Sequence, residues 1–248
     1  MAASGGNAIG GGGGGGGLAA RLGSILEAIS PTVAPPADDT AVYFAEALGK
    51  ACGGGSADTG VLFFGDSDIS NWDVWVGFPG YKLQRCGVGG AQMSHIAAFA
   101  PNAMERYRKI SAVVVVAGEN DLPTRTAGET FAFFKEFLQA VRAVAPQLPV
   151  LYIRTKPEPR TVAIHDRYAK YDRLIAALAE EADPNLVVVG EWRSFLTPRE
   201  DSEAAAADPT LFAEDQLHLS AFGYDLWNDW VADALAEVGI FPQAPARL

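Results

Sequence analysis

The chain has 248 residues, of which 49% are hydrophobic, and a formal net charge of -11 at pH 7. This length and apolar content are enough for one α/β domain with a substantial core. The acidic balance argues against nucleic acid or an anionic membrane as a partner, because both attract clustered Lys and Arg, and no apolar run reaches the roughly 18 residues that span a bilayer.

The high Gly and Pro content of residues 1–37 predicts a flexible tail. The tail includes an unbroken glycine run from Gly10 to Gly17, which has no side chains to pack. A short helix is expected over 18–29, before a series of prolines. No basic segment leads into an apolar one, so no secretory signal is evident and we expect a cytoplasmic protein, with organellar targeting left open. The compact domain is expected over 38–248.

From residue 60 onward, short apolar runs alternate with helical patterns. The runs are apolar throughout, which is typical of parallel strands that are covered on both faces. We therefore predict a three-layer α/β/α sandwich with five parallel strands. The predicted strands are 61–64, 82–86, 112–117, 150–155 and 186–189, and the predicted helices are 41–50, 94–108, 128–145, 161–181 and 221–238.

Polar or glycine-rich signals follow several of these strands. Ser67 follows the first strand, the run from Gly87 to Gly90 the second, and Asn120 the third. Asp215 and His218 lie between the fifth strand and the last helix. Each signal has a simpler structural interpretation, such as a helix cap, a tight turn or a boundary residue. Because ligands bind at the carboxyl ends of parallel strands, their shared position favours a site.

Acyl transfer is the chemistry that these residues could perform. A serine hydroxyl needs a base to take its proton. His95 and His165 lie near the starts of predicted helices and are interpreted as surface or boundary residues. His218 instead follows Asp215 by three residues, a spacing that lets the carboxylate reach Nδ1 and leaves Nε2 for Ser67.

Three groups could stabilise the oxyanion of such a reaction. They are the backbone N–H of Ser67, the backbone N–H of Gly90 and the side-chain amide of Asn120. Glycine suits the second role because it lets the backbone approach a ligand without a Cβ. A nucleotide site is the alternative for the glycine run, but residues 87–92 do not fit GxGxxG and a Walker A motif is absent.

The polar blocks together resemble the SGNH hydrolases, also called GDSL esterases or lipases. The first block is Phe64-Gly65-Asp66-Ser67, and the second contains Gly90 at the position of the family's oxyanion glycine. Gly118-Glu119-Asn120-Asp121 matches the family's GxND pattern, and the segment from Asp215 to His218 matches DxxH. The blocks occur in family order over residues 60–235.

This resemblance implies a flavodoxin-like sheet of strand order 2-1-3-4-5, a triad of Ser67, His218 and Asp215, and no metal or cofactor. The segments 68–72, 117–122 and 156–160 are similar to a bacterial-type subgroup of the family. An α/β-hydrolase is the alternative for a serine after a strand, but the segment after Gly65 lacks the second glycine of GxSxG.

Several other residues have two interpretations each. Trp72 and Trp75 could line an acyl pocket or pack on a short helix after the first strand. Lys156 and Arg160 could meet an acidic substrate or belong to a solvated loop. Asp66 could cap the dipole of the helix that follows it.

The two cysteines, Cys52 and Cys86, have no metal-binding spacing and do not make a disulfide framework. We interpret them as small buried apolar residues.

The sequence thus predicts a serine esterase that acts on short-chain acyl or acetyl esters, including esters on a carbohydrate, through an acyl-enzyme. The predicted partner is a small-molecule ester, and the oligomeric state is not readable from the sequence. A lysophospholipase or thioesterase on the same triad is one alternative. A non-catalytic binding module that retains the fold is the other.

Overall fold

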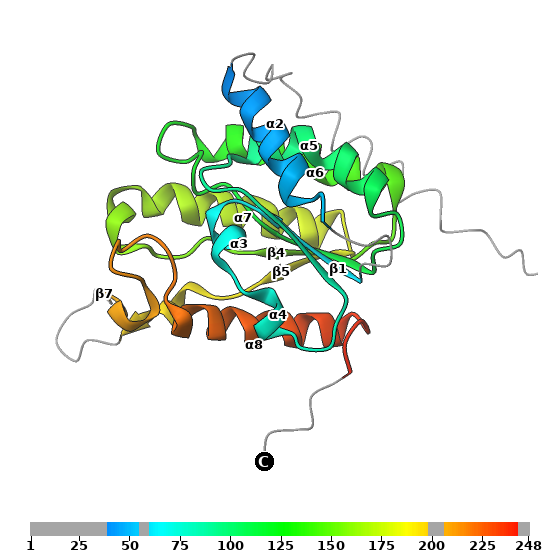
Figure 1. Cartoon of the computed structure of the whole chain (residues 1–248). Helices are drawn as coiled ribbons and strands as arrows, with labels where there is room; N and C mark the ends of the chain where they lie inside the picture. Colours follow the sequence, from blue (N-terminus) through cyan, green and yellow to red (C-terminus); the bar gives the residue numbers. More distant parts are fainter. Residues whose placement is uncertain (1–38, 55–59, 198–205, 243–248) are drawn as a thin grey trace, which may run out of the picture.

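The computed structural model describes residues 39–54, 60–197 and 206–242 (Figure 1). The tail predicted for 1–37, with its helix over 18–29, lies outside the described residues. The predicted domain boundary therefore stays a prediction.

The sheet has five parallel strands in the order β2-β1-β3-β4-β5, which confirms the predicted fold class. The register places Phe64 of β1 between Cys86 of β2 and Val115 of β3. All residues of β1 and of β3 are buried, as their apolar sequences predict. The strands are β1 (Val61–Gly65), β2 (Leu83–Gly87), β3 (Ala112–Val116), β4 (Val150–Ile153) and β5 (Leu186–Val189).

Helices cover both faces of the sheet. The helices are α2 (Asp39–Ala51), α3 (Ser67–Asn71), α4 (Val74–Gly77), α5 (Met93–Arg106), α6 (Ala127–Val144), α7 (His165–Glu181) and α8 (Ala221–Glu237). In Figure 1, α2, α5, α6 and α7 lie on one side of the sheet and α8 on the other. Phe64 enters the core on the α5, α6 and α7 side, whereas Phe63 enters the core beside α8. Two separate cores therefore explain why β1, β3, β4 and β5 carry apolar or aromatic residues on both faces, whereas the edge strand β2 also carries Gln84 and Arg85.

Some short elements were not predicted from the sequence. The helix expected over 161–181 is a 3₁₀ turn, η1 (Pro159–Ile164), followed by α7, because Thr161 has non-helical φ and ψ angles. The short helix expected after the first strand is α3, whereas the short helix α4 was not assigned. The same holds for the elements between β5 and α8, which are η2 (Trp192–Phe195), β6 (Leu196–Thr197), β7 (Ala206–Ala207) and η3 (Pro209–Leu211).

Cys52 and Cys86 form a disulfide, which corrects the interpretation of these residues as unpaired apolar side chains. Both are buried, as predicted. Their Cα atoms are 4.8 Å apart although 34 residues separate them in sequence. They meet because α2 packs against β2. Disulfides persist mainly in oxidising compartments, so the cytoplasmic location stays a prediction.

None of the helices in the described ranges is long and apolar enough to cross a membrane.

Candidate active site

The first block lies where β1 ends and α3 begins. Gly65 brings the chain so close to β3 that an added Cβ would lie 2.0 Å from Val116 O, so glycine is required there. Asp66 Oδ1 accepts a hydrogen bond from Asp68 N at 3.0 Å, which is the helix-capping role predicted for Asp66. Ser67 is therefore the first residue of a helix at the carboxyl edge of the sheet, and it is half-buried.

The glycine block supplies unpaired backbone donors beside this serine. Val88 N donates to Gly65 O at 3.1 Å and so joins the second block to the first. A Cβ built on Gly89 would lie 4.0 Å from Ser67 Cβ. Gly90 has a φ of +76°, a left-handed conformation that favours glycine. Within the described residues, the N–H groups of Ser67 and Gly90 have no hydrogen-bond partner, so both are available to a ligand.

Asn120 reaches the same place from the loop after β3. Its Nδ2 donates to Ala91 O at 3.1 Å and to Asp66 Oδ2 at 3.3 Å. Burial, and then the charge of Asp68, raises the pKa of Asp66 well above its ordinary value. A protonated Asp66 is a weaker acceptor than a carboxylate. An oxyanion could therefore displace the longer of these two hydrogen bonds.

Asp215 and His218 lie in one loop, whose conformation is held by hydrogen bonds to the Asp215 carboxylate. His218 Nδ1 lies 2.6 Å from Asp215 Oδ2. The other oxygen, Oδ1, accepts from Leu217 N and from His218 N, each at 3.0 Å. The hydrogen bond from His218 is the largest of the effects that lower the pKa of Asp215 to about 2. An ionised Asp215 favours a proton on Nδ1, which leaves Nε2 as the basic nitrogen.

Ser67 and His218 lie at the same edge of the sheet without a direct hydrogen bond. In the described part of the chain, neither Ser67 Oγ nor His218 Nε2 has a hydrogen-bond partner. The start of α8, which follows His218, is tied to α3 by a hydrogen bond of 3.0 Å from Tyr224 OH to Asp68 O. In enzymes without bound substrate, the hydrogen bond between a catalytic base and its nucleophile is often long and shortens only when substrate binds.

Comparison with known proteins identifies the family. The sequence profile of the GDSL-like lipase/acylhydrolase family matches residues 57–226, which is more than half of the chain. The chain belongs to this family. No protein of curated function matches it in sequence.

Solved structures resemble this GDSL-family chain in fold at low sequence identity. A candidate acylhydrolase from Bacteroides fragilis NCTC 9343 is 18% identical with a TM-score of 0.62, over 81% of this chain and 98% of that one. A mutant acetyl esterase with an acetate ion is 15% identical with a TM-score of 0.55, over 73% and 97%. A carbohydrate esterase family 3 protein from Talaromyces cellulolyticus is 16% identical with a TM-score of 0.57, over 73% and 97%.

The other two histidines of this GDSL-family chain have structural contacts. His95 is buried rather than at the surface, its Nδ1 accepts from Gln92 N at 3.0 Å, and its ring stacks on Phe44. His165 is half-buried, with Nε2 2.9 Å from Glu158 O. These contacts leave His218 as the histidine that combines a carboxylate partner with an unpaired Nε2.

The two tryptophans proposed as pocket residues differ in their surroundings. Trp72 is 1% exposed, donates from Nε1 to Asn228 Oδ1 at 2.9 Å and packs against Trp227. Of its two interpretations, packing is therefore the one that holds, because Trp72 belongs to the core beneath α3 and does not line an acyl pocket. Trp75 is 49% exposed, and the Arg85 guanidinium lies 5.1 Å from its ring centre.

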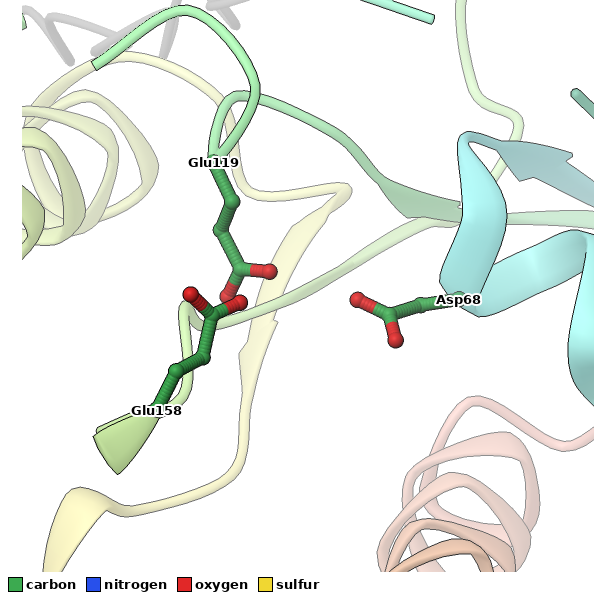
Figure 2. Close-up of side chains that lie close together, drawn as sticks. All are labelled: Asp68, Glu119 and Glu158. Atoms are coloured by element: carbon green, nitrogen blue, oxygen red, sulfur yellow. The ribbon is translucent and has the colours of Figure 1, made fainter. Parts of the chain in front are cut away.

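Lys156 departs most from the sequence analysis. It was placed in a solvated loop or against a substrate, but it is 1% exposed, so both interpretations are wrong. Its Nζ lies 2.5 Å from Asp68 Oδ2, 2.5 Å from Glu119 Oε2 and 2.8 Å from Glu158 Oε1. Figure 2 shows the three carboxylates, which converge from separate segments. Their oxygens lie within 4.8 Å of one another, a spacing suited to a metal ion, but here they surround the lysine ammonium.

Sequence reasoning missed this cluster because no motif marks it. Asp68 and Lys156 are 88 residues apart, and Glu119 and Lys156 are 37 residues apart. The available signal was that Asp68 and Glu119 directly adjoin Ser67 and Asn120 in sequence.

A cavity of about 510 Å³ opens beside the His218 loop. Its lining includes the apolar Pro159 and Phe212 and the polar Glu214 and Gln216. Its volume lies within the range of small-molecule sites. This mixed lining suits a ligand with both apolar and polar parts.

Proposed function

We propose that this chain is a serine esterase that hydrolyses acetyl and other short-chain acyl esters through an acyl-enzyme intermediate. The observation that carries the proposal is the pair of Asp215 and His218, joined at 2.6 Å, with Nε2 unpaired among the described residues. The proposal is supported by the hydrogen bond from Tyr224 OH to Asp68 O, which joins α8, the helix that follows this pair, to α3, the helix that begins with Ser67. Membership of the GDSL-like lipase/acylhydrolase family supports ester chemistry.

In the first half-reaction, Ser67 Oγ attacks the ester carbonyl carbon while His218 Nε2 takes the hydroxyl proton. Asp215 is ionised and stabilises the imidazolium that forms. The bond between the carbonyl carbon and the alcohol oxygen then breaks. His218 returns the proton to that oxygen, the alcohol leaves, and the acyl group stays on Ser67.

In the second half-reaction, water attacks the acyl group and gives its proton to His218. The bond to Ser67 Oγ breaks, the proton returns to that oxygen, and the acid leaves. In both halves the negative oxygen accepts hydrogen bonds from Ser67 N–H, Gly90 N–H and the Asn120 amide. Each such donor typically contributes about 100- to 1000-fold to the rate.

The proposed substrate is a small acyl ester of a hydroxyl-rich alcohol such as a carbohydrate. Gly89 has no side chain to compete with a small acyl group beside Ser67, since an added Cβ would lie 4.0 Å from Ser67 Cβ. The alcohol would lie in the cavity that includes Glu214 and Gln216, whose side chains can hydrogen-bond hydroxyl groups. The structural neighbours named as acetyl and carbohydrate esterases point the same way as an analogy of fold.

The test is hydrolysis of p-nitrophenyl esters from acetate to decanoate, together with labelling by a fluorophosphonate probe. Wild type is compared with Ser67→Ala and with Ser70→Ala, a control serine in the same helix. We expect wild type and Ser70→Ala to prefer the shortest esters and to be labelled. Ser67→Ala should lose labelling and about 1000-fold or more in kcat.

Other outcomes separate the alternatives. A preference for long chains, or for acyl thioesters over oxygen esters, would favour a lysophospholipase or a thioesterase on the same serine. A wild-type protein that neither hydrolyses these esters nor reacts with the fluorophosphonate probe would favour a binding module. Equal activity in wild type and Ser67→Ala would contradict the proposal.

A further inference from the structure

One buried cation joins helix α3, which carries Ser67, to the loop that carries Asn120. Lys156 Nζ contacts Asp68, the residue after Ser67, and Glu119, the residue before Asn120, each at 2.5 Å. Asp68 belongs to α3, Glu119 to the loop after β3, and Lys156 to the loop after β4. A single ammonium group therefore bridges three segments at the carboxyl edge of the sheet.

The position of this ammonium is fixed by further contacts. Lys156 N donates to Glu119 Oε1 at 2.8 Å, and Glu158 Oε1 accepts from Nζ at 2.8 Å. Glu158 Oε2 in turn accepts from Thr161 Oγ1 at 2.9 Å and from Tyr168 OH at 3.2 Å. Lys156 and Glu158 are each 1% exposed. Such a buried network is rigid because every displacement breaks several hydrogen bonds at low dielectric.

The charge state of the cluster excludes a role for Lys156 as a base. Burial opposes the charged form of Lys156, but the three carboxylates outweigh burial and raise its pKa well above the ordinary value. Burial, followed by the charge of Glu158, raises the pKa of Glu119 well above its ordinary value. Lys156 therefore stays a cation, and its ammonium group is committed to oxygens of Asp68, Glu119 and Glu158.

The N-cap of α3 and the loop of Asn120 also share a hydrogen bond of 3.3 Å from Asn120 Nδ2 to Asp66 Oδ2. An oxyanion that binds Asn120 would displace that bond. The bridge through Lys156 is buried and would stay intact during the reaction.

We propose that Lys156 is a positioning residue that fixes Ser67 relative to Asn120 through Asp68 and Glu119. The inference rests on the proposed esterase function. Its physical basis is that a shift of about 1 Å between reacting groups can cost about 100-fold in rate. Loss of the bridge should therefore lower kcat and leave KM nearly unchanged, because Lys156 itself touches no substrate.

The experiment is a double-mutant cycle of Asp68→Asn and Lys156→Met. Asp68→Asn keeps the size of the side chain and removes its charge. Lys156→Met alone leaves buried carboxylates without a cation and could fail to fold, so Asp68→Asn provides an independent test. Asp183→Asn is the matched control, because it makes the same change in a buried ion pair with Arg142 at the opposite edge of the sheet.

We expect Asp68→Asn to lower kcat on p-nitrophenyl acetate by about 10- to 100-fold with KM within about 3-fold of wild type. The double variant should be no slower than Lys156→Met alone, because both substitutions break one bridge. Asp183→Asn should lower Tm and keep kcat within about 2-fold of wild type. Proportional loss of kcat and Tm in all variants would instead indicate a merely structural role and overturn the proposal.

Hydrogen exchange measured by mass spectrometry tests the bridge without substrate. Exchange in segments 66–70 and 119–121 should rise in Asp68→Asn and stay at the wild-type level in Asp183→Asn. Unchanged exchange in Asp68→Asn would overturn the bridge whatever the activity. A wild type without turnover or probe labelling would instead contradict the proposed function, and the exchange experiment would still decide the bridge.

Discussion

Two buried ion-pair sites lie at opposite edges of the sheet, and they differ in charge balance. At the amino edge, Arg142 Nε and Nη2 meet the two oxygens of Asp183 at 2.7 and 3.1 Å. The planar guanidinium matches a carboxylate one to one. This balanced pair ties the end of α6 to the turn before β5. It adjoins none of the residues proposed for catalysis in the sequence.

At the carboxyl edge, one lysine contacts three acidic side chains. Two more acidic residues, Asp66 and Asp121, are also buried, and each lies two residues in sequence from a member of this cluster. Protons relieve part of this excess negative charge, since burial raises the pKa values of Asp66, Glu119 and Asp121. Buried charges are costly unless they are well paired. We infer that the balanced pair serves stability and that the unbalanced cluster is retained for the geometry of the site.

The largest effect expected at the carboxyl edge comes from Asp215→Asn. The amide oxygen of the asparagine can still accept the backbone hydrogen bonds of the loop. Its NH₂ group, however, cannot accept a hydrogen bond from the N–H at Nδ1 of His218. We expect kcat to fall by about 1000- to 10,000-fold, as for the aspartate of other triads, with little change in Tm. Steady-state kinetics beside Asp225→Asn, the same change at an exposed residue of α8, measures this. Comparable loss in Asp225→Asn would mean that general surface charge, rather than the pair, supports activity.

The amino edge should show the opposite behaviour. Asp183→Asn leaves the Arg142 guanidinium without its carboxylate, and breaking a buried pair costs about 3 kcal/mol. We expect urea denaturation to show this loss of unfolding free energy while kcat stays at the wild-type level. A variant of unchanged stability, or one with strongly reduced kcat, would remove the contrast between the two edges.

The smallest expected effect concerns Asp121 and pH. Burial raises its pKa from 3.8 to about 7, so between these values the folded state binds more protons than the unfolded state. Stability contributed by Asp121 therefore falls as the pH rises from 4 to 7. Asp121→Asn mimics the protonated form, and we expect it to be more stable than wild type at pH 8 by about 1 kcal/mol or more. Melting curves of both proteins at pH 5 and pH 8 should show that the stability advantage of Asp121→Asn is smaller at pH 5. An advantage of equal size at both pH values would refute the raised pKa of Asp121.

The parts of the site that depend on neighbouring residues could be predicted from the sequence. Asp215 and His218 are three residues apart, and the carboxylate reaches the imidazole and two backbone N–H groups within that span. Asp66 caps α3 two residues away. The apolar runs predicted the strands to within two residues at each end, because burial on both faces favours apolar side chains, although the edge strand β2 also holds Gln84 and Arg85.

Contacts between distant segments were decided by the tertiary structure. A lysine in a Pro-containing loop is usually solvated, and only the order of the strands brings Lys156 to Asp68 and Glu119. The same holds for the disulfide between Cys52 and Cys86, which needs α2 to pack on β2. Trp72 is buried because α8 covers it, which its own neighbours in sequence do not indicate.

The sequence by itself therefore determined the strands, their order through the family resemblance, and the local geometry of each block. The tertiary structure decided how the blocks are held together. The physical reason is range: turns, caps and helical spacing act within a few residues, whereas the burial and charge of a side chain depend on which segments the sheet order places beside it.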